Sequence, residues 1–177
     1  TGGLWGLGCN AIHFIDLIAY ITGDTDFKIS DIDFGKKLVP AYSVITGSRE
    51  SKYIEFFGSL HGKFNSGTFF NFTCIEEQTP FTVTIQTQNK KIIIFEEFGK
   101  YFTYTTNEQG LSFIEEFFIM PFQSQLTNIV AEKVILHKDC LLTKYQESSK
   151  LHITLLKSYL SYLDKINSSS SKILPIT

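Results

Sequence analysis

The chain has 177 residues, of which 43% are hydrophobic and 19% charged, and its formal net charge is −2 when histidine is neutral. These values exclude an intrinsically disordered chain, and the lack of a basic excess argues against a nucleic acid as a partner. The length suffices for one hydrophobic core, so we expect a single domain over residues 1–177.

Three segments have helical character. Apolar residues of the segment 9–21 would occupy nearly every face of a helix, which predicts a buried helix that ends at Gly23. Helical spacing returns at 123–136 and 143–163, and Thr143 with Gln146 has the form of a capping box. Between the first and second helices, alternating residues predict strands at 27–33, 37–46, 51–63, 68–75, 81–87, 91–95, 100–106 and 111–119.

The order of these elements indicates the fold class. Strands that are followed by helices are typical of an α+β domain, so we expect a largely antiparallel, mixed β-sheet with helices packed on one face. The other face would be broad and rich in aromatic residues, and such a face needs covering. We therefore expect a homo-oligomer that forms through this sheet face.

The cysteines and the hydropathy indicate the compartment. Cys9, Cys74 and Cys140 are widely spaced and include no Cys-x-x-Cys pair, which favours a reducing environment over a disulfide scaffold or a structural zinc site. The sequence has no signal peptide and no apolar run of about 18 residues. We expect a cytoplasmic protein without a membrane partner.

A narrow polar stripe lies on the first predicted helix. Cys9, His13, Asp16 and Tyr20 follow one another at spacings of four, three and four residues, so their side chains share one face. A histidine on an apolar helix is either satisfied within the core or held there for proton transfer. The polar residues that gather at the start of this helix favour the second interpretation.

Three other chemistries are less well supported by this segment. Gly6-x-Gly8-x-x-Ala11 resembles a dinucleotide fingerprint, but the buried strand that must precede it is missing, so we expect no cofactor-binding residues here. Cys9 and His13 are too few to hold a metal, and we expect none. A hydrolase that uses Cys9 with His13 lacks a visible oxyanion site and an orienting third group.

The same residues resemble the C-terminal domain of the glucose–fructose oxidoreductase/inositol dehydrogenase (Gfo/Idh/MocA) family. The family pattern is a glycine run, then Asp-x-Gly-x-His-x-x-Asp on a helix, then a glycine that ends the helix. This chain has Gly2-Gly3, then Cys9-Asn-Ala-Ile-His-Phe-Ile-Asp16, then Gly23. The likeness covers essentially the whole chain, and the ending Leu174-Pro-Ile-Thr177 is similar to members from surface-polysaccharide pathways.

The resemblance implies an NAD(P)-dependent oxidoreductase that acts on a sugar or nucleotide-sugar. His13 would be the catalytic acid and base, alone or together with a lysine outside this chain. Trp5, Cys9, Asn10 and Asp16 would line the sugar site. NAD or NADP would be bound mainly by an N-terminal Rossmann domain, so we expect no cofactor for this chain alone.

Two departures from the family pattern leave an alternative open. Cys9 stands where many members have an acidic residue four positions before the histidine. The nucleotide-binding domain is absent, and the chain begins at Thr1 with Met120 as its single methionine, so we expect a piece of a longer protein that is inactive by itself. The alternative is a non-catalytic ligand-binding or oligomerisation module.

Overall fold

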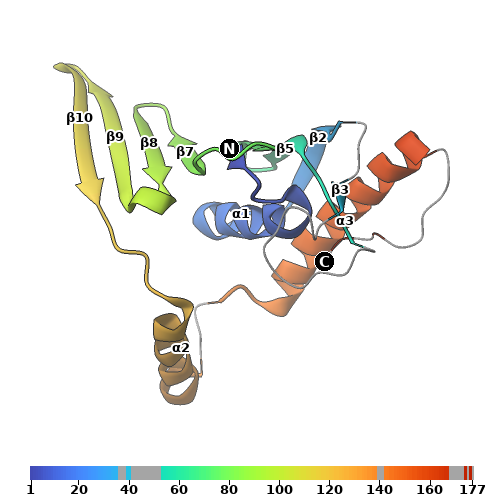
Figure 1. Ribbon diagram of the computed structural model, residues 1–177. Helices are drawn as coiled ribbons and strands as arrows, with labels where there is room; N and C mark the ends of the chain where they lie inside the picture. The colour runs from blue at the N-terminus through green and yellow to red at the C-terminus, as the bar shows by residue number, and fades with distance from the viewer. Residues whose placement is uncertain (36–38, 41–52, 139–141, 168–173, 175, 177) are drawn as a thin grey trace. The chain divides into compact units, whose positions relative to one another are not determined.

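The computed structural model of the chain describes residues 1–35, 39–40, 53–138, 142–167, 174 and 176 (Figure 1). Contacts divide the chain into two compact units. The α1 unit comprises Gly2–Thr79 and Thr143–Thr177, and the β7–β10 unit comprises Thr1 and Pro80–Leu142. The expectation of a single domain over residues 1–177 therefore stays a prediction.

The α1 unit combines two helices with a mixed sheet. The four-stranded sheet has the order β1-β6-β5-β2, in which β1 runs parallel to β6 and the other neighbours are antiparallel. Strands β3 and β4 form a separate antiparallel pair. The elements are β1 (Gly2–Gly3), α1 (Leu7–Thr22), β2 (Phe27–Asp33), β3 (Val39–Pro40), β4 (Ile54–Glu55), β5 (Gly58–Phe64), β6 (Phe69–Ile75) and α3 (Tyr145–Asn167).

The core of this unit lies between the two helices and one face of the sheet. Helix α1 contacts both α3 and β6, and α3 contacts β2. Alternate residues of the strands are buried, as a sheet covered on one face requires. Buried positions on α3 recur every four residues, which places them on one helix face. The core includes Leu7, Ala11, Ile15, Leu60, Phe64, Phe70, Cys74, Leu151, Leu155, Tyr159 and Leu163.

The β7–β10 unit is built around a second, fully antiparallel sheet. Its four strands form a meander in the order β10-β9-β8-β7. Large apolar side chains of β10 are exposed on both faces, with Phe113 54% and its neighbour Ile114 53% accessible. The elements are β7 (Thr82–Gln86), β8 (Lys90–Phe95), the 3-10 helix η2 (Glu96–Phe98), β9 (Lys100–Asn107), β10 (Gly110–Phe117) and α2 (Gln123–His137).

These elements confirm the predicted α+β class with largely antiparallel, mixed sheets and helices. Helix α1 begins at Leu7, two residues before the predicted start. It ends where predicted, because Gly23 adopts the left-handed conformation with φ +69° and its N–H donates to the carbonyl of Ala19. Within the described residues, no helix is both long and apolar enough to span a membrane. Most of the strand predicted at 37–46 lies outside the described residues.

The single strand predicted at 51–63 is wrong. Two strands, β4 and β5, occupy this region, and residues 51–52 lie outside the described part. Phe56 and Phe57 are consecutive and both buried, whereas a strand that is covered on one face buries alternate residues. Gly58 then adopts φ +123°, which redirects the chain into β5.

The capping box predicted from Thr143 and Gln146 is also wrong. Helix α3 begins at Tyr145, and the carbonyl of Lys144 accepts from the N–H of Ser148, so Lys144 is the N-cap residue. The hydroxyl of Thr143 instead donates to Asp16 Oδ2 at 2.9 Å. The side chain therefore connects the segment before α3 to helix α1.

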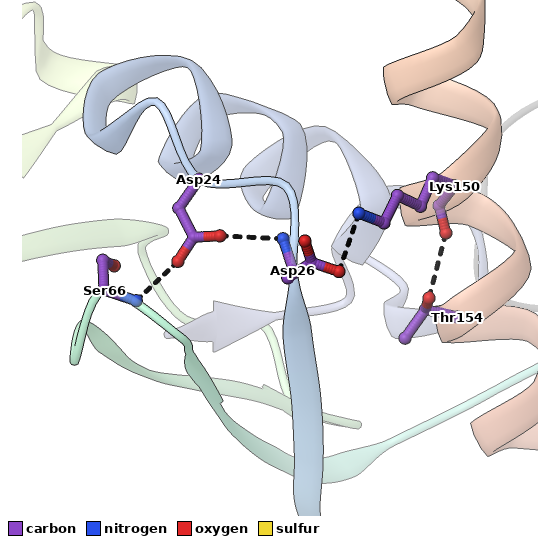
Figure 2. A network of polar contacts seen from close by, with 5 residues as sticks. All are labelled: Asp24, Asp26, Ser66, Lys150 and Thr154. Carbon is purple, nitrogen blue, oxygen red and sulfur yellow. Dashed lines mark hydrogen bonds and ion pairs between the residues drawn. The ribbon is translucent and has the colours of Figure 1, made fainter.

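A polar network fastens three parts of the α1 unit together (Figure 2). Asp24, just after α1, accepts from the N–H of Asp26 at 2.9 Å and from the N–H of Ser66 in the β5–β6 turn. Asp26 in turn pairs with Lys150 Nζ of α3 at 2.7 Å. The network therefore joins the end of α1, the sheet turn and α3.

This network predicts a contribution to stability that depends on pH. The backbone N–H groups of Asp26 and Ser66 hold the pKa of Asp24 below its usual value. Because the folded-state pKa is the lower one, the stabilisation is present above the unfolded-state pKa and is lost as the pH falls through the folded-state pKa. We expect Asp24→Asn to flatten the acid decline of the urea midpoint. Exposed Glu108→Gln is the control, and parallel pH profiles for wild type and Asp24→Asn would contradict this prediction.

Candidate functional site

The start of helix α1 is held by the segment that precedes it. The N–H of Leu4 donates to the carbonyl of Ile75, and Trp5 Nε1 donates to the carbonyl of Thr73 at 2.8 Å. The indole ring also packs edge-on against Phe14, at a centroid distance of 5.5 Å. Trp5 therefore anchors the helix to β6, and its single hydrogen-bond donor is used inside the protein.

A buried carboxylate closes the first turn of α1. Glu55 at the end of β4 has no accessible surface, and its Oε1 accepts from the backbone N–H groups of Gly8 and Phe56. The thiol of Cys9 donates to Glu55 Oε2 at 2.8 Å. Glu55 therefore supplies the acceptor that α1 itself lacks, since its N-cap is Gly6 and its first turn has no acidic residue.

Sequence reasoning missed Glu55. The residue lies 46 positions from Cys9 along the chain, so no spacing rule connects them. The available signal was a charged residue inside the apolar run Tyr53-Ile-Glu-Phe-Phe57. An isolated acid between large apolar residues is costly to bury unless donors surround it.

Two further polar groups lie around this cluster. The hydroxyl of Tyr159 on α3 donates to the carbonyl of Leu7 at 2.9 Å, and the N–H of Gly6 donates to Cys74 Sγ. Burial, followed by the nearby charge of Glu55, raises the pKa of Tyr159 well above its usual value. Burial also raises the pKa of Cys74. Both groups therefore remain protonated at neutral pH and serve the structure of the helix start.

His13 lies one helical turn beyond Cys9, and its side chain is exposed. Asn10 and Cys9 are half-buried, and the amide nitrogen of Asn10 donates to the carbonyl of Trp5. The structure thus brings Trp5 and Asn10 together at the start of α1. An exposed imidazole on a helix that is firmly held at its first turn can exchange a proton with a bound molecule.

Asp16 points to another part of the α1 unit. Its Oδ2 accepts from the Thr143 hydroxyl, while Oδ1 is buried without a hydrogen-bond partner among the residues described. The half-buried carboxylate therefore holds the segment before α3. Of the four stripe residues, only His13 and Tyr20 have exposed side chains, and that of Tyr20 is 70% accessible.

The helix start does not fit a dinucleotide phosphate. A phosphate at a helix N-terminus needs free backbone N–H groups and a positive potential. Here the N–H of Gly8 already donates to Glu55, and a phosphate would meet this buried carboxylate. As for metals, no cluster of three or more suitable side chains occurs in the part of the chain that the structure describes.

The chain therefore has an α+β fold with mixed and antiparallel sheets, and this fold recurs in a known enzyme structure. UDP-N-acetylglucosamine 3-dehydrogenase GnnA from Acidithiobacillus ferrooxidans superimposes with a TM-score of 0.55 at 11% identity, covering 82% of this chain and 45% of that chain. An oxidoreductase from Bacillus cereus gives a TM-score of 0.48 at 13% identity, covering 94% of this chain and 50% of that one.

The likeness to GnnA shows the fold alone. No family model matches the sequence, and no curated protein matches it either. The chain spans half or less of the two solved oxidoreductase structures. The comparisons therefore do not establish the activity of a whole protein that contains this chain.

Proposed function

We propose that the chain is the substrate-binding part of an NAD(P)-dependent oxidoreductase that acts on a sugar or nucleotide-sugar. The observation that carries this proposal is the exposed His13 on a helix whose first turn is held by Glu55 and Trp5. Support comes from the fold, because GnnA, which shares it, is named as a dehydrogenase of a UDP-sugar. A role in surface-polysaccharide biosynthesis in the cytoplasm is part of the same proposal.

The chain's own contribution would be substrate binding and proton transfer. Oxidation of a sugar hydroxyl to a ketone removes the proton from the hydroxyl oxygen and a hydride from the carbon that bears this oxygen. His13 as a neutral imidazole would accept the proton in this direction and return it in the reverse reaction. Oxidised NAD or NADP would supply the hydride acceptor when bound, and residues outside this chain would hold the cofactor, because the start of α1 does not fit its phosphates.

The half-buried residues before His13 would contact the sugar. Asn10 and Cys9 lie about one turn from His13, and Asn10 is fixed by its bond to the carbonyl of Trp5. An amide held in this way offers hydrogen bonds to sugar hydroxyls at little cost in side-chain entropy. Asp16 would support the site through Thr143 and the segment before α3.

The test uses the whole encoded protein with NAD+ or NADP+ and a panel of nucleotide-sugars that includes UDP-N-acetylglucosamine. We expect the absorbance of reduced nicotinamide to rise with at least one sugar. Binding of a panel sugar without turnover would favour the alternative, a non-catalytic ligand-binding module. No binding and no turnover with any sugar would contradict both proposals.

The second part of the proposal is a homo-oligomer that forms through the β7–β10 sheet. Phe113 is stacked on Phe102 with ring centroids 5.5 Å apart, and Phe117 on the same face is 74% accessible. An exposed aromatic surface of this kind is typical of an interface. A second copy of the chain would cover it.

This proposal predicts a change in mass in solution. We expect the wild-type protein to sediment as an oligomer, and Phe113→Asp combined with Phe117→Asp to yield monomers, because two buried charges cannot be accommodated at an apolar interface. Glu108→Lys in the nearby turn is the control. A monomeric wild type, or an unchanged oligomer in the double variant, would contradict the proposal.

A further inference from the structure

The carboxylate of Glu55 lies in an unusual place for an ionisable group. It has no accessible surface, yet it receives three donors, which are the N–H groups of Gly8 and Phe56 and the thiol of Cys9. A buried carboxylate is tolerated only when donors and a favourable potential surround it. The positive end of α1 supplies that potential, because Oε1 of Glu55 accepts from the N–H of Gly8 in the first turn of the helix.

The cluster is connected to the exposed face of α1 through Cys9. Cys9 precedes His13 by one turn and lies on the same side of the helix, so a shift of the first turn would move both residues. A carboxylate on α1 itself could perform the same task from position 9, but this chain has a thiol there. The negative charge instead comes from β4, and the thiol connects it to the helix.

We propose that Glu55 is a positioning residue for His13, supplying from β4 the carboxylate that fixes the first turn of α1. The proposal rests on the proposed function of His13 as the proton-transfer group. Glu55 holds the turn through Gly8 and sets the direction of the Cys9 side chain. It also places a fixed negative charge at the end of the helix where the substrate would bind.

The substitution Glu55→Gln tests the charge of the Glu55 side chain separately from its hydrogen bonds to the backbone N–H groups of Gly8 and Phe56. The glutamine oxygen can still accept from Gly8 and Phe56, but the group next to Cys9 becomes a neutral NH2 donor. We expect kcat to fall by about tenfold to a hundredfold, since small displacements of a reacting group have effects of this size. Glu76→Gln, an exposed glutamate of the same unit, is the control and leaves kcat unchanged.

A second substitution places the carboxylate on α1 itself, at position 9. In the variant that combines Cys9→Asp with Glu55→Gln, the glutamine NH2 can donate to the new carboxylate, and most of the lost kcat is regained. Cys9→Asp alone places two carboxylates in hydrogen-bond contact and lowers kcat. A folded Glu55→Gln variant with wild-type kcat would overturn the proposal, as would a combined variant no better than Glu55→Gln.

An NMR measurement on the 177-residue chain keeps this proposal distinct from the proposed function. We expect the His13 ring signals to shift in Glu55→Gln and to stay in place in Glu76→Gln. If the whole protein turns over no sugar but this shift is seen, the proposed function fails and the positioning of His13 by Glu55 stands. If the His13 signals are the same in all three proteins, the positioning proposal fails even where the enzyme is active.

Discussion

Replacing His13 by glutamine in the whole encoded protein is expected to lower kcat by about a hundredfold to ten-thousandfold, the range typical of a lost general acid or base. The side chain is exposed on α1, so its loss removes little packing and the protein remains folded. Because the proton transfer occurs only in the reaction, kcat and kcat/KM should fall together while the Kd for NAD or NADP is unchanged. Initial rates and cofactor titration measure these quantities.

A second histidine provides the matched control for this experiment. His152 on α3 is also exposed, and its Nδ1 contacts the carbonyl of Ser148 at 2.8 Å within its own helix. We expect His152→Gln to leave kcat unchanged. If both variants turn over sugar at the wild-type rate, His13 has no part in the chemistry, and the chain is better described as a binding module.

The sequence was sufficient to find α1 and to single out His13 on it, because both depend on local spacing. The exposure of His13 was not predicted, since the many apolar residues of α1 indicated a buried helix, whereas Leu17 and Ile21 are also exposed. Helix periodicity identified the apolar faces around His13, and Gly23 marked the end of the helix. The strands of the β7–β10 sheet were equally visible, since alternation of side chains is also a local property. The α+β class follows from these local patterns.

Contacts between distant segments could not be predicted in this way. Glu55 reaches the start of α1 from 46 residues away, and Asp16 bonds to Thr143 across 127 residues. A capping box was predicted at Thr143 because its pattern is local, but the contact with Asp16 prevailed. Sequence reasoning therefore located the helix that carries the site, but it missed Glu55 and the contact between Asp16 and Thr143.

The boundary between β4 and β5 shows a backbone requirement that hydropathy does not report. Gly58 has φ +123°, and a Cβ built there would lie 1.9 Å from the carbonyl oxygen of Asp33 and 2.8 Å from Cα of Phe34. Both neighbours are backbone atoms, so a side chain forces the strands apart. Glycine is needed because the chain both turns and approaches β2 closely.

We therefore expect Gly58→Ala to destabilise the protein by at least about 3 kcal/mol, combining backbone strain with the clash against β2. Gly67→Ala is the matched control, since Gly67 also has positive φ, at +96°, but a Cβ there meets nothing within 4 Å. Its cost should be backbone strain alone, roughly 1 kcal/mol. Urea unfolding measures both, and equal losses would show that the close approach to Asp33 contributes nothing. Because Gly58 follows Glu55 by three residues, any folded Gly58→Ala protein should also show displaced His13 ring signals, which Gly67→Ala should leave in place.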